Sequence, residues 1–180
     1  MLFRSVFASH GVGAGRSVTQ GVTDMELGAK YVLVDGATHR LGLAVEPVLS
    51  LPTGIDALTS GAYDPTVKLA WSLPVAAGFS ASGNANLARV GDELGRYTET
   101  MLTAAAGHDL PGGFSGFWEV YGSLASGRPG AAAWNVDTGV THLLAKAVQV
   151  DVEVGRGLTG TATDWFVGAG IGIRAPRVFR

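Results

Sequence analysis

Apolar and polar residues alternate along most of the 180-residue chain, and this period of two is typical of β-strands with two unlike faces. Residues 147–157 read AVQVDVEVGRG, so four valines share one register while Gln149, Asp151 and Glu153 share the other. The alternation is weakest over 97–108, where either phase leaves threonines or a glutamate among the apolar positions. No helical period of comparable strength is present, so we expect an all-β protein. The expected strands cover 2–9, 25–33, 39–51, 66–73, 78–88, 97–108, 114–124, 134–144, 148–157 and 164–174.

The segments between these strands alternate in length. A soluble sandwich has no reason to sort its loops in this way, whereas a transmembrane barrel has short periplasmic turns, longer outer loops and an even number of antiparallel strands. The pattern therefore predicts an antiparallel up-and-down transmembrane β-barrel of about ten strands, with its C-terminus in the periplasm. Short connections are expected near 35–38, 74–77, 109–113 and 145–147, and longer ones at 11–24, 52–65, 89–96, 125–133 and 158–163.

The two registers differ in size as well as in polarity, because one carries large apolar side chains and the other carries polar residues with many glycines and alanines. In hydrocarbon the backbone must pair within the protein, so only helices or closed barrels span a bilayer. Large side chains facing lipid, with small and polar ones facing a narrow lumen, fit this division. The alternative is a soluble lipocalin-like carrier, which would place the valines inside and the Asp151 register in water. Four tryptophans on the apolar register are candidates for an aromatic girdle: Trp71, Trp118, Trp134 and Trp165.

Composition narrows the classes of function. The chain has the length of a single domain, 1–180, with 175–180 as a short C-terminal tail. A net charge of −2 supplies no basic patch, so nucleic acid is not expected as a partner. Hydrophobic residues make up 47% of the chain, yet no apolar run reaches the roughly 18–20 residues of a spanning helix. The absence of cysteine excludes disulfides and thiolate metal sites.

Asp151 and Glu153 are the residues that most suggest catalysis. Two positions apart on a strand, they are separated by about 6.5–7 Å, a spacing that glycoside hydrolysis can use. A small barrel filled with side chains offers no substrate cleft, so we favour a polar lumen wall in which carboxylates face cations from other strands. The four histidines lack metal-ligand spacing, and we expect no metal, no cofactor and no enzymatic activity. The lumen-lining candidates are Glu26, Lys30, Arg40, Glu46, Lys68, Asn84, Asn86, Glu119, Tyr121, Asp137, Gln149, Asp151, Glu153 and Arg174.

Several short motifs, in their order and spacing, resemble one family of membrane proteins. Each motif is weak alone, but together they extend over 21–174, which is most of the chain. The chain thus resembles the outer-membrane β-barrel "transporter" family that is also described as the MetA-pathway of phenol degradation family. The motifs are GVTDMELGAKY at 21–31, LPTG at 51–54, FWE at 117–119, NVDTG at 135–139, QVD at 149–151, GRGL at 155–158 and DWFVG at 164–168, with the closing strand running on to 174.

The resemblance implies a passive transporter or channel for small compounds, hydrophobic or aromatic ones among them, in the outer membrane of a Gram-negative bacterium. Its partners would be outer-membrane lipid, the barrel assembly machinery and a small solute. Members of the family usually begin with a signal peptide and further strands, so we expect this chain to lack an N-terminal part and a full-length relative to have twelve strands. A structural or interaction barrel with a plugged lumen is the alternative.

Overall fold

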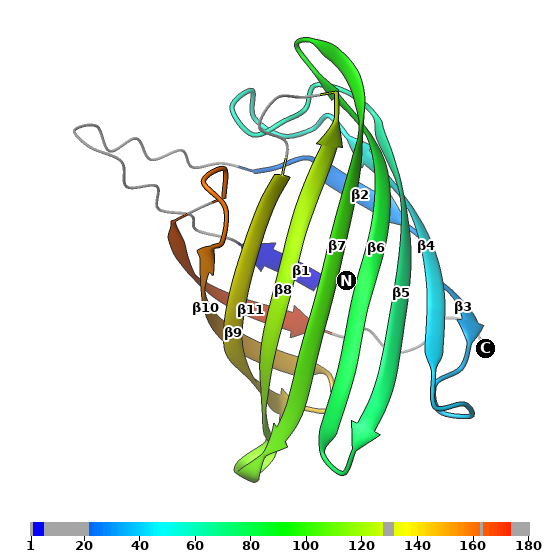
Figure 1. Cartoon of the computed structure of the whole chain (residues 1–180), viewed down its shortest axis with the longest axis vertical. Coiled ribbons are helices and arrows are strands. Elements are labelled where there is room, and N and C mark those ends of the chain that lie inside the picture. The colour runs from blue at the N-terminus through cyan, green and yellow to red at the C-terminus, as the bar shows by residue number, and fades with distance from the viewer. Residues whose placement is uncertain (1, 6–21, 128–131, 163, 174–180) are drawn as a thin grey trace.

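The computed structural model describes residues 2–5, 22–127, 132–162 and 164–173, and β-strands account for most of them (Figure 1). The strands are long in the middle of the chain, where β7 reaches 16 residues. Each strand overlaps a predicted one, although β5, β6 and β7 extend beyond their predicted bounds by two to four residues. The described residues form eleven strands: β1 (Leu2–Ser5), β2 (Met25–Gly28), β3 (Tyr31–Val34), β4 (Gly42–Leu51), β5 (Asp64–Ala76), β6 (Phe79–Asp92), β7 (Gly95–Leu110), β8 (Phe114–Ser126), β9 (Ala132–Ala145), β10 (Val148–Gly157) and β11 (Trp165–Ile173).

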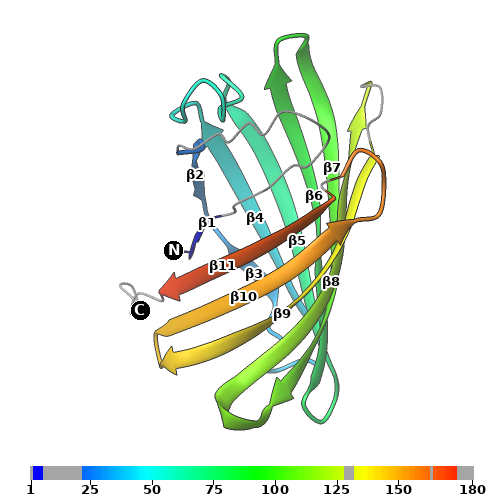
Figure 2. The ribbon, with the colours of Figure 1, turned by 90° about the vertical axis from the view of Figure 1, so that its left-hand side faces the viewer.

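All the strands lie in one antiparallel sheet with the order β1-β11-β10-β9-β8-β7-β6-β5-β4-β2, and β3 also pairs with β4. From β4 to β11 every strand pairs with the next one in the sequence, which is the up-and-down arrangement. The first strand pairs with the last, with Leu2 opposite Gly172. Among the described residues no pairing joins β1 to β2, so the sheet curls round in the manner of a barrel without being closed there (Figure 2). The predicted all-β, antiparallel up-and-down fold is confirmed.

β2 and β3 are two parts of what the sequence predicts as one strand. Both pair with β4, and the register that places Gly28 opposite Val48 continues without a shift into β3. The break falls at Ala29, whose amide donates to the Pro47 carbonyl at 3.2 Å. Proline has no N–H and cannot return the second hydrogen bond of this antiparallel pair. The interruption therefore comes from a single residue of β4, and it turns ten expected strands into eleven.

Short and long connections alternate around the sheet as predicted, except that the connection between β6 and β7 is short where a long loop was expected. Ala77 and Gly78 join β5 to β6, and Lys146 and Ala147 join β9 to β10, whereas longer segments follow β4 and β10. These two kinds of connection lie at opposite ends of the strands, which are called here the short-turn end and the long-loop end.

The expected long loop at 89–96 is wrong. β6 and β7 continue to a two-residue turn at Glu93 and Leu94, with Asp92 paired to Gly95. Gly95 has a φ of 106°, a backbone conformation that side-chain-bearing residues rarely adopt. The resulting hairpin extends beyond its neighbours (Figure 1). Polar residues on both faces hid these strand ends in the sequence, because the alternation fades where neither face is apolar.

The apolar side chains lie on the opposite face from that expected in a soluble sheet. On β10, Val152 and Val154 are 59% and 50% exposed, whereas Glu153 between them is 7% exposed. We call the face that carries the valines the outer face and the one that carries Glu153 the inner face. No large side chain of the described residues is fully buried, so a dense apolar core is absent from this part of the chain. Exposed apolar residues recur on the outer face of the other strands, for example Leu27, Val67, Leu87, Val120, Val167 and Ile171.

The only helical element of the described residues is one 3₁₀ turn, Pro111–Gly113, between β7 and β8. Within the same residues, no helix has the length and apolar character needed to cross a membrane.

Candidate functional site

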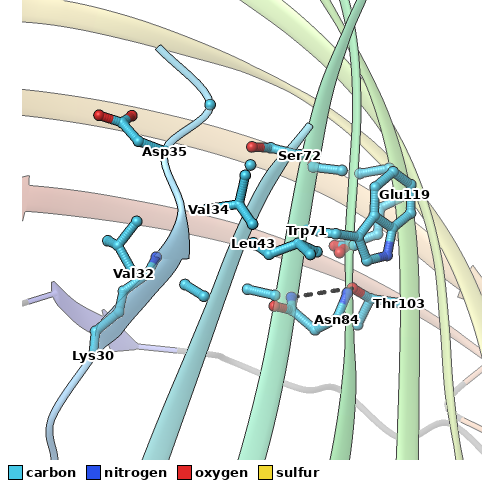
Figure 3. Close-up of a pocket in the computed structure, with 17 residues that line it drawn as sticks. Lys30, Val32, Val34, Asp35, Leu43, Trp71, Ser72, Asn84, Thr103 and Glu119 are labelled. Atoms are coloured by element: carbon cyan, nitrogen blue, oxygen red, sulfur yellow. Dashed lines mark hydrogen bonds between the residues drawn. The ribbon is translucent and has the colours of Figure 1, made fainter. Parts of the chain in front are cut away.

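The inner face borders a cavity of about 430 Å³ that lies against β3 to β8 (Figure 3). Its central wall consists of small residues, Gly42 and Ala44 from β4 and Ala70 from β5. Because these side chains are short, space remains in front of the strands. β3 contributes Val32 and Val34 on one side of the cavity. The sequence therefore builds this hollow by placing small residues on the inner register of two adjacent strands.

The opposite side of the cavity is polar. Asn84 of β6 and Thr103 of β7 are cross-strand partners, and Thr103 Oγ1 accepts hydrogen bonds from the backbone N and from Nδ2 of Asn84, at 3.1 and 3.3 Å. Ser72, Ser82 and Glu119 line the cavity near this pair. Figure 3 shows Asn84, Thr103 and Glu119 across the hollow from Val32 and Lys30. The cavity thus has a hydrogen-bonding side at Asn84 and Thr103, and a second side on which the apolar Val32 and Val34 lie between the charged Lys30 and Asp35.

One of the candidate cations lines this cavity, a second pairs with a carboxylate of β2, and a third lies in a turn. Lys30, between β2 and β3, lines the cavity. Lys68 of β5 forms an ion pair with Glu26 of β2 at 3.5 Å, and its cross-strand partner in β4 is Glu46. Arg40 precedes β4 in the turn and donates to the Pro74 carbonyl at 3.5 Å, so the structure does not place it on a strand. Arg174 lies outside the described residues.

A second group of candidates meets where β8 to β11 curve. The rings of Tyr121 (β8) and Phe166 (β11) contact edge to face at 6.5 Å, although two strands separate them in the sheet. Gly155 of β10 makes this approach possible, since a methyl group there would meet the Phe166 ring at 2.3 Å and Asp137 Cβ at 2.7 Å. Phe166 is 6% exposed and Asp137 3% exposed. The interior is therefore more tightly packed here than at the cavity.

Asp151 and Glu153 lie against glycines of the neighbouring strand. Their cross-strand partners in β11 are Gly170 and Gly168, and a methyl group on either glycine would come within 2.8 Å of a carboxylate oxygen. Gln149, two residues before Asp151, is exposed near the short-turn end. The described residues contain no group of three or more potential metal ligands.

The four tryptophans all fall on the outer register, and Trp118 and Trp165 are exposed. Trp134 and Trp165 lie near the long-loop end of their strands, while Trp71 and Trp118 fall inside β5 and β8. A feature that sequence reasoning missed is a stack of three rings across β6, β7 and β8, in which His108 lies between Phe79 and Trp118 with centroid distances of 5.7 and 5.1 Å.

A second outer-face stack joins Phe114 to His142 at 4.2 Å, and His142 Nδ1 lies 3.1 Å from the Gly113 carbonyl. Together the two stacks place aromatic and imidazole rings on β6 to β9 toward the short-turn end. Both histidines are on the outer register of their strands. This register is the only signal in the sequence that could have predicted their position on the outer face beside the aromatic rings.

Asp24 fastens the β4–β5 loop at the long-loop end. Its two carboxylate oxygens accept hydrogen bonds from the backbone amides of Gly54 and Ser60 at 2.9 and 3.1 Å. The Thr59 hydroxyl, followed by the backbone amides of the loop, lowers the pKa of Asp24 below its usual value. The loop is thus tied to the residue that precedes the edge strand β2.

Asp64, the first residue of β5, holds the β6–β7 hairpin at the long-loop end of the sheet. It is 7% exposed, accepts a hydrogen bond from the Gly91 amide at 2.9 Å and lies 3.6 Å from the Arg96 guanidinium. This contact holds the extended β6–β7 hairpin to the start of β5.

Sequence reasoning found the charged residues of the inner face but missed much of the cavity. Thr103 was hidden because the phase of its strand was ambiguous, and Val32 and Val34 because apolar residues were assigned to the outer face. Ser72 and Ser82 lay on the polar register and could have been found from it.

A comparison with known families gives a match to the model described as "Putative MetA-pathway of phenol degradation", over residues 3–175. No curated protein matches the sequence. The family description names phenol degradation and assigns no catalytic residue to this wall. Because the match extends over nearly the whole chain, from β1 to the end of β11, this protein belongs to the phenol-degradation MetA-pathway family, as its strand motifs led us to expect.

Proposed function

We propose that this chain is an outer-membrane β-barrel of a Gram-negative bacterium and that small solutes cross the membrane passively through its interior. The observation that carries this proposal is the polarity of the sheet. Its outer face exposes large apolar side chains on strand after strand, while Asp64, Asp137 and Glu153 are buried on the inner face. In water such a surface would cost free energy, whereas in lipid it is the favourable arrangement.

The same observation argues against the soluble carrier. A lipocalin-like protein needs its valines inside and its Asp151 register in water. Val152 and Val154 are instead exposed, and Glu153 is buried. Outer-membrane lipid is accordingly the partner proposed for the outer face, and the barrel assembly machinery is the partner proposed for insertion.

The cavity supports a transport role for the interior. Its wall is made by six neighbouring strands and combines small, apolar and hydrogen-bonding residues, which suits small solutes that are not strongly charged. The family description, with its reference to phenol degradation, favours hydrophobic or aromatic compounds. Asp151 and Glu153 act in this proposal as charges of the lumen wall.

A plugged structural barrel is the second candidate, and one contact favours it. Tyr121 and Phe166 meet across the interior at 6.5 Å, which narrows the space enclosed by β8 to β11. In this version the protein would have a scaffold or interaction role and would not conduct.

Planar-bilayer recording separates these possibilities. The purified chain is inserted into a bilayer, and stepwise ion currents above background are expected. If no current is measured at any salt concentration or voltage, while circular dichroism shows an intact sheet, the open interior is wrong and the plugged barrel is favoured. If the chain stays monomeric in buffer without detergent, the membrane assignment itself is wrong.

A further inference from the structure

The cavity of Figure 3 carries a more specific inference about its solute, which rests on the proposed passage through the interior. Thr103 Oγ1 already accepts two hydrogen bonds from Asn84, so its own O–H is left to donate. Asn84 uses Nδ2 in this contact, so its Oδ1 is left to accept. No described residue fills either role. A donor and an acceptor therefore lie side by side on one wall of the cavity.

A hydroxyl group is the simplest partner for this pair, because it donates one hydrogen bond and accepts others. It would accept from Thr103 and donate to Asn84 Oδ1. A half-buried polar pair of this kind discriminates by the cost of leaving its groups without a hydrogen bond when the ligand lacks the matching group.

The remainder of the cavity suits an apolar body. From the Asn84–Thr103 pair the wall continues over Ala70 and Ala44 to Val32 and Val34 on β3. These side chains offer methyl groups and no hydrogen-bonding atoms. A chain of several carbons lying along them would remove apolar surface from water.

The charges around the cavity disfavour an anionic solute. Lys30 supplies one ammonium group, whereas Asp35 and Glu119 supply two carboxylates. An anion in the cavity would therefore meet more like charge than opposite charge.

We propose that this cavity binds an uncharged amphiphile, with its hydroxyl group at Asn84 and Thr103 and its apolar body over Ala44 and Ala70 toward Val32. The solute is recognised by one polar end and one apolar end.

The natural absence of cysteine permits a direct test. Ser82→Cys introduces a thiol into the cavity lining, and Ser123→Cys introduces a matched thiol on the inner register of β8 outside that lining. Each full-length variant is folded into lipid vesicles, and the rate of thiol modification by a small water-soluble methanethiosulfonate is measured. The probes are 1-hexanol, hexanoate and 1,2,6-hexanetriol at equal concentration.

At four times its dissociation constant, 1-hexanol is expected to slow modification of the Ser82→Cys thiol about fivefold, since the ligand-free fraction of the protein is 1/(1 + [L]/Kd). Hexanoate and the triol are expected to protect little, and the Ser123→Cys thiol is expected to react at an unchanged rate. Adding Thr103→Val to Ser82→Cys should weaken the affinity for 1-hexanol about two- to tenfold through the lost hydrogen bond, so that protection at the same concentration falls from about fivefold to between about threefold and about 1.4-fold. The matched Thr141→Val, on the inner register of β9 outside the cavity, should leave protection unchanged.

The outcomes distinguish the two proposals. If the Ser82→Cys thiol is modified but 1-hexanol does not protect it, the amphiphile site is wrong and the open interior stands. Equal protection of both thiols shows partition into lipid and also overturns the site. If neither thiol reacts in folded protein while both react after denaturation, water does not reach the interior, and the proposed function falls together with the site.

Discussion

Glu153 of β10 lies so close to Gly168 of β11 that a methyl group on the glycine would stand 2.6 Å from a carboxylate oxygen. Asp151 has the same relationship with Gly170. The acidic side chains of β10 therefore lie along the inner wall over positions where β11 has no side chain. The glycines at alternate positions of β11 are explained by this contact, because any larger residue would push the carboxylates into the interior.

Glycines of the inner face are expected to differ in their tolerance of a methyl group. Gly155→Ala should destabilise the fold by about 1–3 kcal/mol, because the new atom meets the buried ring of Phe166 and Asp137 Cβ. Gly168→Ala should cost less, since the atom it meets is the flexible end of Glu153. Urea unfolding in lipid vesicles, followed by tryptophan fluorescence, measures both. Equal losses would contradict the packing described at Phe166.

A change of charge is expected to affect folding strongly on the outer face of β10 and little on its inner face. Val152→Arg places a cation on the outer face and should cost about 2–4 kcal/mol if that position lies at the bilayer midplane. Asp151→Asn on the inner face should change folding little. The yield of folded protein in vesicles, read from its heat-modifiable gel mobility, compares the two variants. A greater loss for Asp151→Asn would mean that the assignment of faces is wrong.

Restoring the missing donor in β4 is expected to join β2 and β3. Pro47→Ala supplies an N–H that can donate to the Ala29 carbonyl, a hydrogen bond of net value about 0.5–1.5 kcal/mol. Loss of the proline ring also increases the freedom of the unfolded chain, at a cost of about 0.4–1 kcal/mol. Global stability should therefore change little, whereas amide exchange over 25–34 should slow. Hydrogen–deuterium exchange with mass spectrometry tests this, and Pro65→Ala near the start of β5 is the control. Unchanged exchange after Pro47→Ala would show that another cause divides the strand.

The Asp24 contact is expected to be sensitive to acid. Its pKa is lowered in the folded chain from the ordinary value of 3.8, so its stabilisation is fully present above about pH 5 and is lost as pH falls through the lowered pKa. Asp24→Asn should therefore speed amide exchange of the 52–63 loop at neutral pH, and the difference from the natural chain should shrink in acid.

Asp56→Asn, a substitution at an exposed aspartate in the same loop, is the matched control for Asp24→Asn. Exchange corrected for the intrinsic pH dependence is the quantity to compare. An undiminished difference at acid pH would show that the charge of Asp24 does not hold the loop.

The strands could be predicted from sequence wherever one face is apolar and the other is not. β10 is the clearest case, since its valines alternate without exception with polar residues from Val148 to Val154. β7 was ambiguous because its threonines and alanines fit either face. The β6–β7 hairpin beyond residue 88 was missed because its residues are polar on both sides, and a solvated strand there gives no alternating signal.

The cavity could be predicted only in part, because it depends on which strands become neighbours. The alternation of faces along β6 places Asn84 on the inner face. Only the register between β6 and β7 shows that Thr103 is its cross-strand partner. The interruption at Pro47 likewise requires knowledge of the partner residue across the ladder. The periodicity of a single strand does not determine which residues of other strands it contacts.

The β6–β7 hairpin offers a direct way to determine the orientation of the protein in a cell envelope. Its tip consists of Glu93 and Leu94, and Leu94 is 80% exposed. Exposed turns tolerate insertions better than paired strands do, and Asp64 would continue to anchor the hairpin below the tip. A short epitope inserted between Glu93 and Leu94 would therefore be displayed clear of the sheet, and antibody staining of intact cells would reveal which end of the wall faces the surroundings.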